Sequence, residues 1–156
     1  MGEIRVKVRF ESYDDKLAHQ AGRIPETAIR TRETDAVVDT GAVMMLLPLD
    51  LVEELGLKIT GRTTALLANN QTVELPCAGP VHLTLVGRDW MTDCLVGPPG
   101  CETLIGQLVM ERLDLIPDPR LHTLTVRPES PLGPTLKLKG LNNAIPHGTI
   151  PSALIY

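Results

Sequence analysis

Aromatic side chains are scarce in this 156-residue chain, where Phe, Trp and Tyr together make up 3% of the residues. The core must therefore be packed by aliphatic side chains. Hydrophobic residues amount to 43%, which is enough for one domain to bury a core without disulfide bonds. The aromatic residues are Phe10, Tyr13, Trp90 and Tyr156.

Cysteine is also scarce, and long apolar runs are missing. Cys77, Cys94 and Cys101 have neither the spacing of a zinc site nor the even number of a secreted disulfide scaffold, so we expect reduced thiols. Residues 1–7 alternate charged and apolar side chains, unlike a signal peptide, and no segment approaches the length of a membrane span. We therefore expect a cytoplasmic protein with no membrane partner.

An excess of positive charge is lacking as well. The net charge of −4 argues against binding to nucleic acid, which requires clustered Lys and Arg. No carboxylate or cysteine lies at metal-ligand spacing from a histidine, so we expect no metal and no cofactor. The four histidines are His19, His82, His122 and His147.

Hydrophobic periodicity predicts an all-β core in the first half of the chain. Residues 4–10 alternate apolar and charged side chains, as in a strand with one buried face. Residues 11–26 are polar and irregular, which indicates a loop with a short helical turn. An extended pattern resumes at 28–32, and residues 36–42 predict a strand that runs into a glycine-containing turn.

A short helix and a hairpin are expected next. Pro48 suits the start of a helix over 48–55, and Gly56 suits its left-handed end. Two short extended segments, 64–67 and 72–75, flank residues 68–71, where paired Asn residues tolerate the positive φ angles of a tight turn. This pattern predicts a projecting hairpin. Further strands are expected at 81–85 and 90–96.

The remaining patterns place one more helix and a tail. An apolar segment at 104–106 leads into a predicted helix over 107–113, and short strands are expected at 115–116 and 121–126. Five prolines fall within 128–156, which indicates a tail that wraps around the domain or is mobile. We thus predict a domain over 1–127, with one or two short helices, and a C-terminal tail over 128–156.

Asp39-Thr40-Gly41 is the candidate for chemistry. Asp39 follows three apolar residues, so its carboxylate comes at the end of a buried strand and needs compensation. Gly41 allows backbone amides to approach the carboxylate, and the Thr40 hydroxyl can form lateral hydrogen bonds. The same three residues could equally be an aspartate that caps its own turn.

The order of motifs along the chain resembles the retropepsin-like, or retroviral-type, aspartic protease family. Residues 36–42 resemble the catalytic strand and loop of that family, and the hairpin around Asn69, Asn70 and Gln71 falls where the family has its flap. Leu104-Ile105-Gly106 resembles the segment that crosses beneath the catalytic loop, and residues 107–113 resemble the helix after it. The resemblance spans about residues 3–127 and implies a small, closed, acid-protease-like β-barrel.

The resemblance also implies an activity and a homodimer. The family uses two aspartates that face one water molecule, and this chain has one Asp-Thr-Gly, so the second carboxylate must come from Asp39 of another copy. The expected activity is that of an aspartic endopeptidase on a peptide or protein substrate, with Asp39, Thr40 and Gly41 in catalytic roles. The expected substrate-binding residues are Ala42, Val43, Leu67, Asn69, Asn70, Gln71 and Ile105.

Other interpretations of the same residues are open. The fold can serve as a catalytically inactive dimerisation or peptide-binding module, because fold does not settle activity. A small β-barrel adaptor, in which Asp-Thr-Gly is coincidental, is a third interpretation. The 128–156 tail is hypothesised either to supply a dimer contact or to lie in the cleft as an inhibitor or self-cleavage site.

Overall fold

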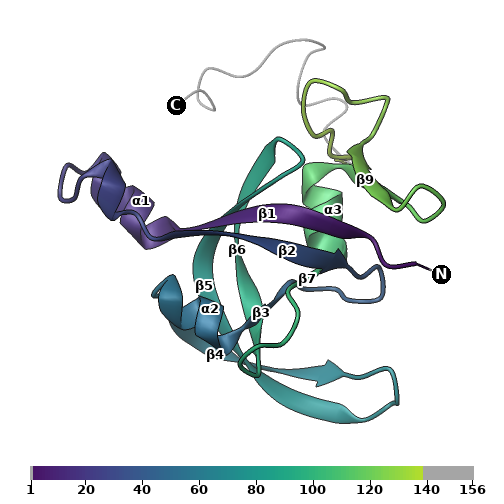
Figure 1. The fold of residues 1–156 in the computed structure, drawn as a ribbon, viewed down its shortest axis with the longest axis horizontal. Helices are drawn as coiled ribbons and strands as arrows, with labels where there is room; N and C mark the ends of the chain where they lie inside the picture. The colour runs from purple at the N-terminus through teal and green to yellow at the C-terminus, as the bar shows by residue number, and fades with distance from the viewer. Residues whose placement is uncertain (1, 139–156) are drawn as a thin grey trace.

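The computed structural model describes residues 2–138, and these form a mostly β structure with short helices (Figure 1). One sheet has seven strands in the order β1-β2-β7-β3-β6-β5-β4. The bounds of these strands are Arg5–Ser12 (β1), Thr31–Val38 (β2), Leu46–Pro48 (β3), Lys58–Leu66 (β4), Thr72–Leu85 (β5), Arg88–Gly97 (β6) and Leu104–Ile105 (β7).

A smaller sheet and the helices complete the described fold. Strands β8 (Leu115–Asp118) and β9 (Thr123–Val126) pair antiparallel with each other. The helices are α1 (Tyr13–Gln20), α2 (Leu49–Glu54) and α3 (Gln107–Leu113), with a 3-10 turn at Glu26–Ala28. The prediction of a mostly β fold is confirmed.

Strand β1 has two partners in the sheet. It pairs antiparallel with β2 along most of its length, and its second half also pairs antiparallel with β5, where Phe10 lies opposite Leu83. The hydrogen-bonded pairings therefore run from β1 through β2, β7, β3, β6 and β5 and return to β1, while β4 lies outside this circuit.

The core is aliphatic, as the composition predicts. Phe10 is fully buried and is surrounded by Leu, Val, Ile and Met side chains from the strands and from α2 and α3. Alternation is clear in β5, where Val81, Leu83 and Leu85 are buried and the residues between them are half-buried. The period-2 pattern read from this segment is therefore confirmed.

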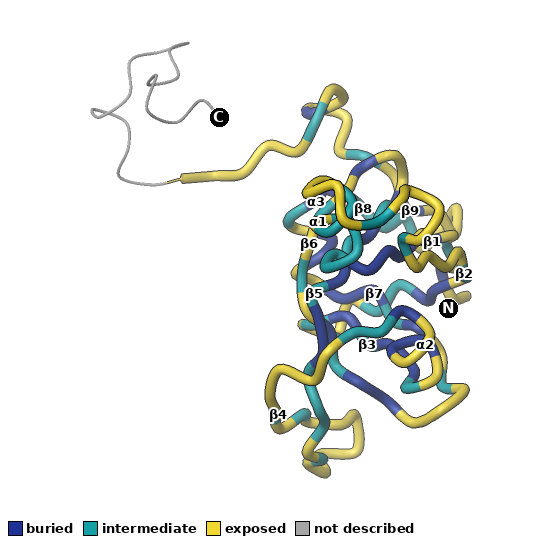
Figure 2. The backbone as a smooth tube through the Cα atoms, turned by 90° about the vertical axis from the view of Figure 1, so that its left-hand side faces the viewer, coloured by how far each residue is buried: buried dark blue, intermediate teal, exposed yellow. Residues whose placement is uncertain are grey.

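The predicted hairpin is confirmed in β4 and the first part of β5. It projects from the body of the molecule, and most of its residues are exposed (Figure 2). At its tip the amide of Leu67 donates to the carbonyl of Gln71, 2.8 Å away, and Asn70 has a φ of 64°. Asn70 thus occupies the left-handed conformation that the paired asparagines predict.

Both helices expected from the sequence are present, and a third was not foreseen as such. Helix α3 has the predicted bounds, and α2 is followed by Gly56 with a φ of 63°. Helix α1 replaces much of the predicted irregular loop. It has no buried residue, and Ser12 caps it by accepting from the amide of Asp15.

The first part of the tail is attached to the domain. Ser130 is buried, its hydroxyl donates to the carboxylate of Asp114, and the guanidinium of Arg88 donates to its carbonyl. The amide of Thr135 also donates to Asp114, over 3.2 Å. Ser130 and Thr135 thus contact the domain, as in a tail that wraps around it, and residues 139–156, with the roles hypothesised for them, lie outside the described residues.

Candidate functional site

Asp39 comes directly after β2, at the place where this strand lies between β1 and β7. Strands β2 and β7 are parallel, with Val38 opposite Ile105. The amide of Val38 donates to the carbonyl of Ile4, and the amide of Asp39 donates to the carbonyl of Ile105, each over 2.9 Å. The backbone that leads into Asp39 is thus held from two sides, by Ile4 and by Ile105.

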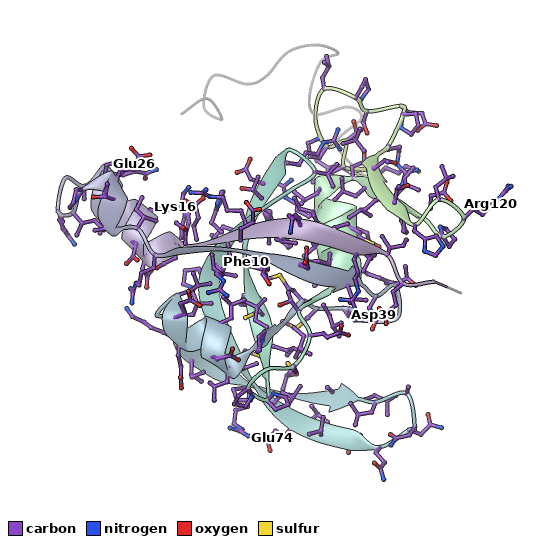
Figure 3. The ribbon with its side chains drawn as sticks, in the orientation of Figure 1. Phe10, Lys16, Glu26, Asp39, Glu74 and Arg120 are labelled. Carbon is purple, nitrogen blue, oxygen red and sulfur yellow. The ribbon has the colours of Figure 1, made fainter. Side chains whose placement is uncertain are left out.

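The turn after Asp39, which is labelled in Figure 3, is built around the carboxylate of this residue. The amide of Gly41 donates to Asp39 Oδ1 over 2.9 Å, and the amide of Ala42 donates to the Asp39 carbonyl over 3.2 Å. The expectation that Gly41 brings an amide to the carboxylate is confirmed. Within residues 2–138 no donor lies on Asp39 Oδ2, and the residue is half-buried, so one carboxylate oxygen is left for another group.

Gly106 lies directly beneath this loop. A Cβ atom at Gly106 would lie 2.7 Å from the carbonyl oxygen of Met44 and 2.8 Å from those of Ala42 and Val43. Gly106 has a φ of −99° and a ψ of −175°, an extended conformation open to any residue. The glycine is therefore required by the close approach of the loop and not by its own backbone conformation.

The residues after Gly106 bind the loop by hydrogen bonds. The amide of Gln107 donates to the carbonyl of Ala42 over 2.8 Å, and the amide of Leu108 donates to that of Val43 over 3.0 Å. The side-chain amide of Gln107 donates to the carbonyl of Thr40 over 2.7 Å. The sequence suggested lateral bonds from the Thr40 hydroxyl, whereas the contact found here is made through the Thr40 carbonyl.

The sequence did not predict Gln107 as a site residue. It was predicted only to begin the helix over 107–113. The available signal was its position: a side chain that can donate a hydrogen bond directly follows the glycine of the segment beneath the loop. Position alone does not show whether that side chain turns toward the loop. In the structure it does, and it contacts the carbonyl of Thr40.

Six of the seven expected substrate-binding residues fall into two surface groups. Ala42 is half-buried and Val43 is 60% exposed beside the Asp39 loop. Leu67 is 43% exposed at the hairpin, whose tip also exposes Asn69, Asn70 and Gln71. In Figure 3 the hairpin projects on the side of the molecule that carries Asp39. Within the described residues no hydrogen bond joins the two groups.

The expectation that the side chain of Ile105 binds substrate is wrong. Its side chain is fully buried in the core, because alternate residues of β7 face opposite sides and Ile105 faces inward. What Ile105 contributes to the site is its carbonyl oxygen, which accepts from the amide of Asp39.

A cavity of about 260 Å³ lies elsewhere, between β2, α2 and the loop at 100–103. Cys101 lines it, and none of Asp39, Thr40 and Gly41 does. Burial, and then the nearby Asp50 carboxylate, raises the pKa of the Cys101 thiol. This is the opposite of what a thiolate nucleophile needs, so the cavity has no activated cysteine.

The sequence was compared with protein-family models and with curated proteins. A scan against protein-family models finds no match to the chain, and a search of curated proteins finds no significant match either. Within residues 2–138 no helix is both long and apolar enough to cross a membrane. The same part of the chain contains no group of three side chains placed to hold a metal ion.

Proposed function

We propose that this chain is one half of a retropepsin-like aspartic endopeptidase, completed when a second copy brings its own Asp39 to face the first. The observation that supports the proposal is the way the loop after Asp39 is hydrogen-bonded and packed. A carboxylate that follows the buried end of β2 has one oxygen held by the amide of Gly41 and the other open, over a glycine that lets the loop pack against β7. This is an arrangement for holding a carboxylate in one place.

A homodimer follows from the number of available carboxylates. Activation of water by this chemistry needs two carboxylates at one water, and the chain has a single Asp-Thr-Gly. Several other aspartates are bound elsewhere: Asp35 to Lys7, Asp89 to His82, and Asp50, Asp114 and Asp118 to backbone amides. A twofold axis beside the Asp39 loop is the simplest arrangement that pairs the residue with its own copy.

The paired carboxylates would act as a base and an acid. Two carboxylates so close share one proton, as is general in aspartic proteases. The ionised Asp39 takes a proton from the water, whose oxygen attacks the carbonyl carbon of the peptide, while the protonated Asp39 donates to the carbonyl oxygen. The Asp39 that took the proton from water then donates it to the nitrogen as the C–N bond breaks, while a hydroxyl of the tetrahedral intermediate returns a proton to the other Asp39. Neither a metal nor a cofactor takes part in this proposal.

The rest of the proposal concerns fold, substrate and compartment. The return of the strand pairings to β1 supports a small closed barrel, with the β4–β5 hairpin as a flap that binds an extended peptide by strand-like hydrogen bonds. The exposed Val43 and Leu67 would contact apolar side chains of that peptide. Free thiols at Cys77, Cys94 and Cys101 support a reducing, cytoplasmic location.

The test is an activity scan from acid to neutral pH on a mixed peptide library. Asp39→Asn should abolish cleavage while the dimer mass from sedimentation stays unchanged, and a pepstatin-type inhibitor should block the wild type. Asp35→Asn is the matched control, because Asp35 is an exposed aspartate of the same strand that is paired with Lys7.

Mixing the two proteins tests the shared site directly. An excess of Asp39→Asn chains should lower the activity per wild-type chain, because mixed dimers hold one carboxylate. Activity that survives Asp39→Asn would refute the mechanism. A folded, dimeric wild type that cleaves no peptide would instead favour the inactive dimerisation or peptide-binding module, and a monomer at all concentrations would favour the adaptor.

A further inference from the structure

We infer that Gln107 is a positioning residue for the Asp39-Thr40-Gly41 loop: its side-chain amide holds the Thr40 carbonyl and so determines where Thr40 stands when two copies meet. The inference rests on the proposed function, since it concerns the geometry of the same site. Gln107 would not touch substrate or water itself.

The loop is attached to the start of α3 by three donors. Two are the backbone amides of Gln107 and Leu108, which bind the carbonyls of Ala42 and Val43 after the turn. The third is Gln107 Nε2, which reaches back to the carbonyl of Thr40 inside the turn, 2.7 Å away. The backbone bonds persist with any residue except proline at position 107, so of the three contacts only the one to Thr40 depends on the side chain.

This contact gives the turn an anchor that is independent of the Asp39 carboxylate. The other hydrogen bonds of the turn run from the amides of Gly41 and Ala42 back to Asp39. The bond from Ala42 ends on the Asp39 carbonyl and the bond from Gly41 ends on the carboxylate. Without Gln107, the Asp39 carboxylate would be the one side chain within residues 2–138 that holds the turn by a hydrogen bond. Thr40 is exposed, so packing does not hold it in place.

Helix α3 is a suitable base for such an anchor. Val109, Met110 and Leu113 bury its inner face in the core, while Gln107 is exposed at its first position. A change of the Gln107 side chain therefore removes no core packing. Variants at this position are expected to fold, which makes the role open to kinetic test.

The chemistry of the side chain allows a sharp test through pH. Gln107→Met has a similar length and cannot donate at any pH, whereas Gln107→Glu can donate only when its carboxyl group is protonated, ordinarily below a pKa of about 4.3. Gln107→Lys keeps a donor at every pH of the scan. Gln20→Glu is the matched control, because Gln20 is an exposed glutamine at the end of α1.

The experiment measures kcat and KM of the full chain from pH 3 to pH 7, with dimer mass and thermal midpoint recorded for each variant. Misplacement of a catalytic group by about 1 Å costs up to about 100-fold in rate, so we expect Gln107→Met to lose about 10- to 100-fold in kcat at every pH with a smaller change in KM. Gln107→Glu should show the same loss at neutral pH and recover toward the wild-type value in acid, while Gln107→Lys retains activity throughout.

Two results would overturn the inference: wild-type kcat in Gln107→Met, or a Gln107→Glu loss that does not change between pH 7 and pH 3. Failure of the proposed function has a different signature, since the wild type itself would then be inactive. In that case amide hydrogen exchange still decides the role of Gln107. Exchange at Gly41 and Ala42 should be faster in Gln107→Met than in wild type, and equal rates would reject the positioning role.

Discussion

The backbone amide of Asp39 donates a hydrogen bond to the carbonyl oxygen of Ile105, 2.9 Å away. Ile105 is fully buried and belongs to a strand of two residues that lies parallel to β2. The position of the candidate catalytic residue is therefore set by a core residue far along the chain. Changes beneath the loop should affect the site even where they leave Asp39 itself intact.

Gly106→Ala should distort the loop and destabilise the protein. The added methyl group would lie within 2.8 Å of the three carbonyl oxygens above it, and overpacking of this kind costs about 1–3 kcal/mol. We expect a lower free energy of unfolding in urea and, if the proposed activity is present, loss of cleavage. Gly133→Ala is the control, because nothing lies within 4 Å of its Cβ position. Equal stability of the two variants would contradict this account of Gly106.

Arg88→Met should destabilise the attachment of the tail. Arg88 is buried and donates to the carbonyls of Leu113, 2.7 Å away, Asp114, 3.2 Å away, and Ser130. Each of the three buried acceptors left without a donor costs about 1–3 kcal/mol, so a loss of about 3 kcal/mol or more in the free energy of unfolding is expected. Arg88→Lys should restore only part of it, since an ammonium lacks the planar fork of the guanidinium. Full stability of Arg88→Met in urea unfolding would show that water replaces these bonds.

The Asp114 carboxylate should make stability depend on acid pH. The Ser130 hydroxyl, followed by the Arg127 guanidinium, lowers the pKa of Asp114 from 3.8 to about 2, and the Thr135 amide adds to this. Because the folded pKa lies below the unfolded one, the contribution is fully present above about pH 4 and is lost as the pH falls through about 2.

Urea unfolding of Asp114→Asn between pH 5 and pH 2 checks this expectation. The variant should be less stable than the wild type at pH 5, and the difference should shrink toward pH 2. Asparagine is chosen because it tolerates the φ of 53° at this position. Ser130→Ala should show the same trend, since it removes the donor with the largest effect. A difference that stays constant with pH would mean that the interaction is not electrostatic.

Much of the fold is predictable from local patterns, because the spacing of apolar residues within a strand or helix depends only on the residues of that element. Strand β1 shows its buried face every second residue, and α3 shows its apolar side at helical spacing. Asn70 and Gly56 mark turns because few residues adopt a positive φ. Only a short helical turn was predicted where α1 lies, because this helix buries no residue and is mostly polar.

The sequence by itself determined most of the strands though not the short β3 and β7, the hairpin with Asn70 at its tip, the helix that begins at Gln107, and the turn in which Gly41 meets the Asp39 carboxylate. Tertiary structure alone decided which residues meet across long separations. It placed Gly106 against the loop, turned Gln107 toward Thr40, and buried Ile105 where a surface position was expected. Periodicity records only the face that each residue presents within its own element, whereas these contacts depend on how a parallel strand and a helix pack against a loop more than 60 residues earlier.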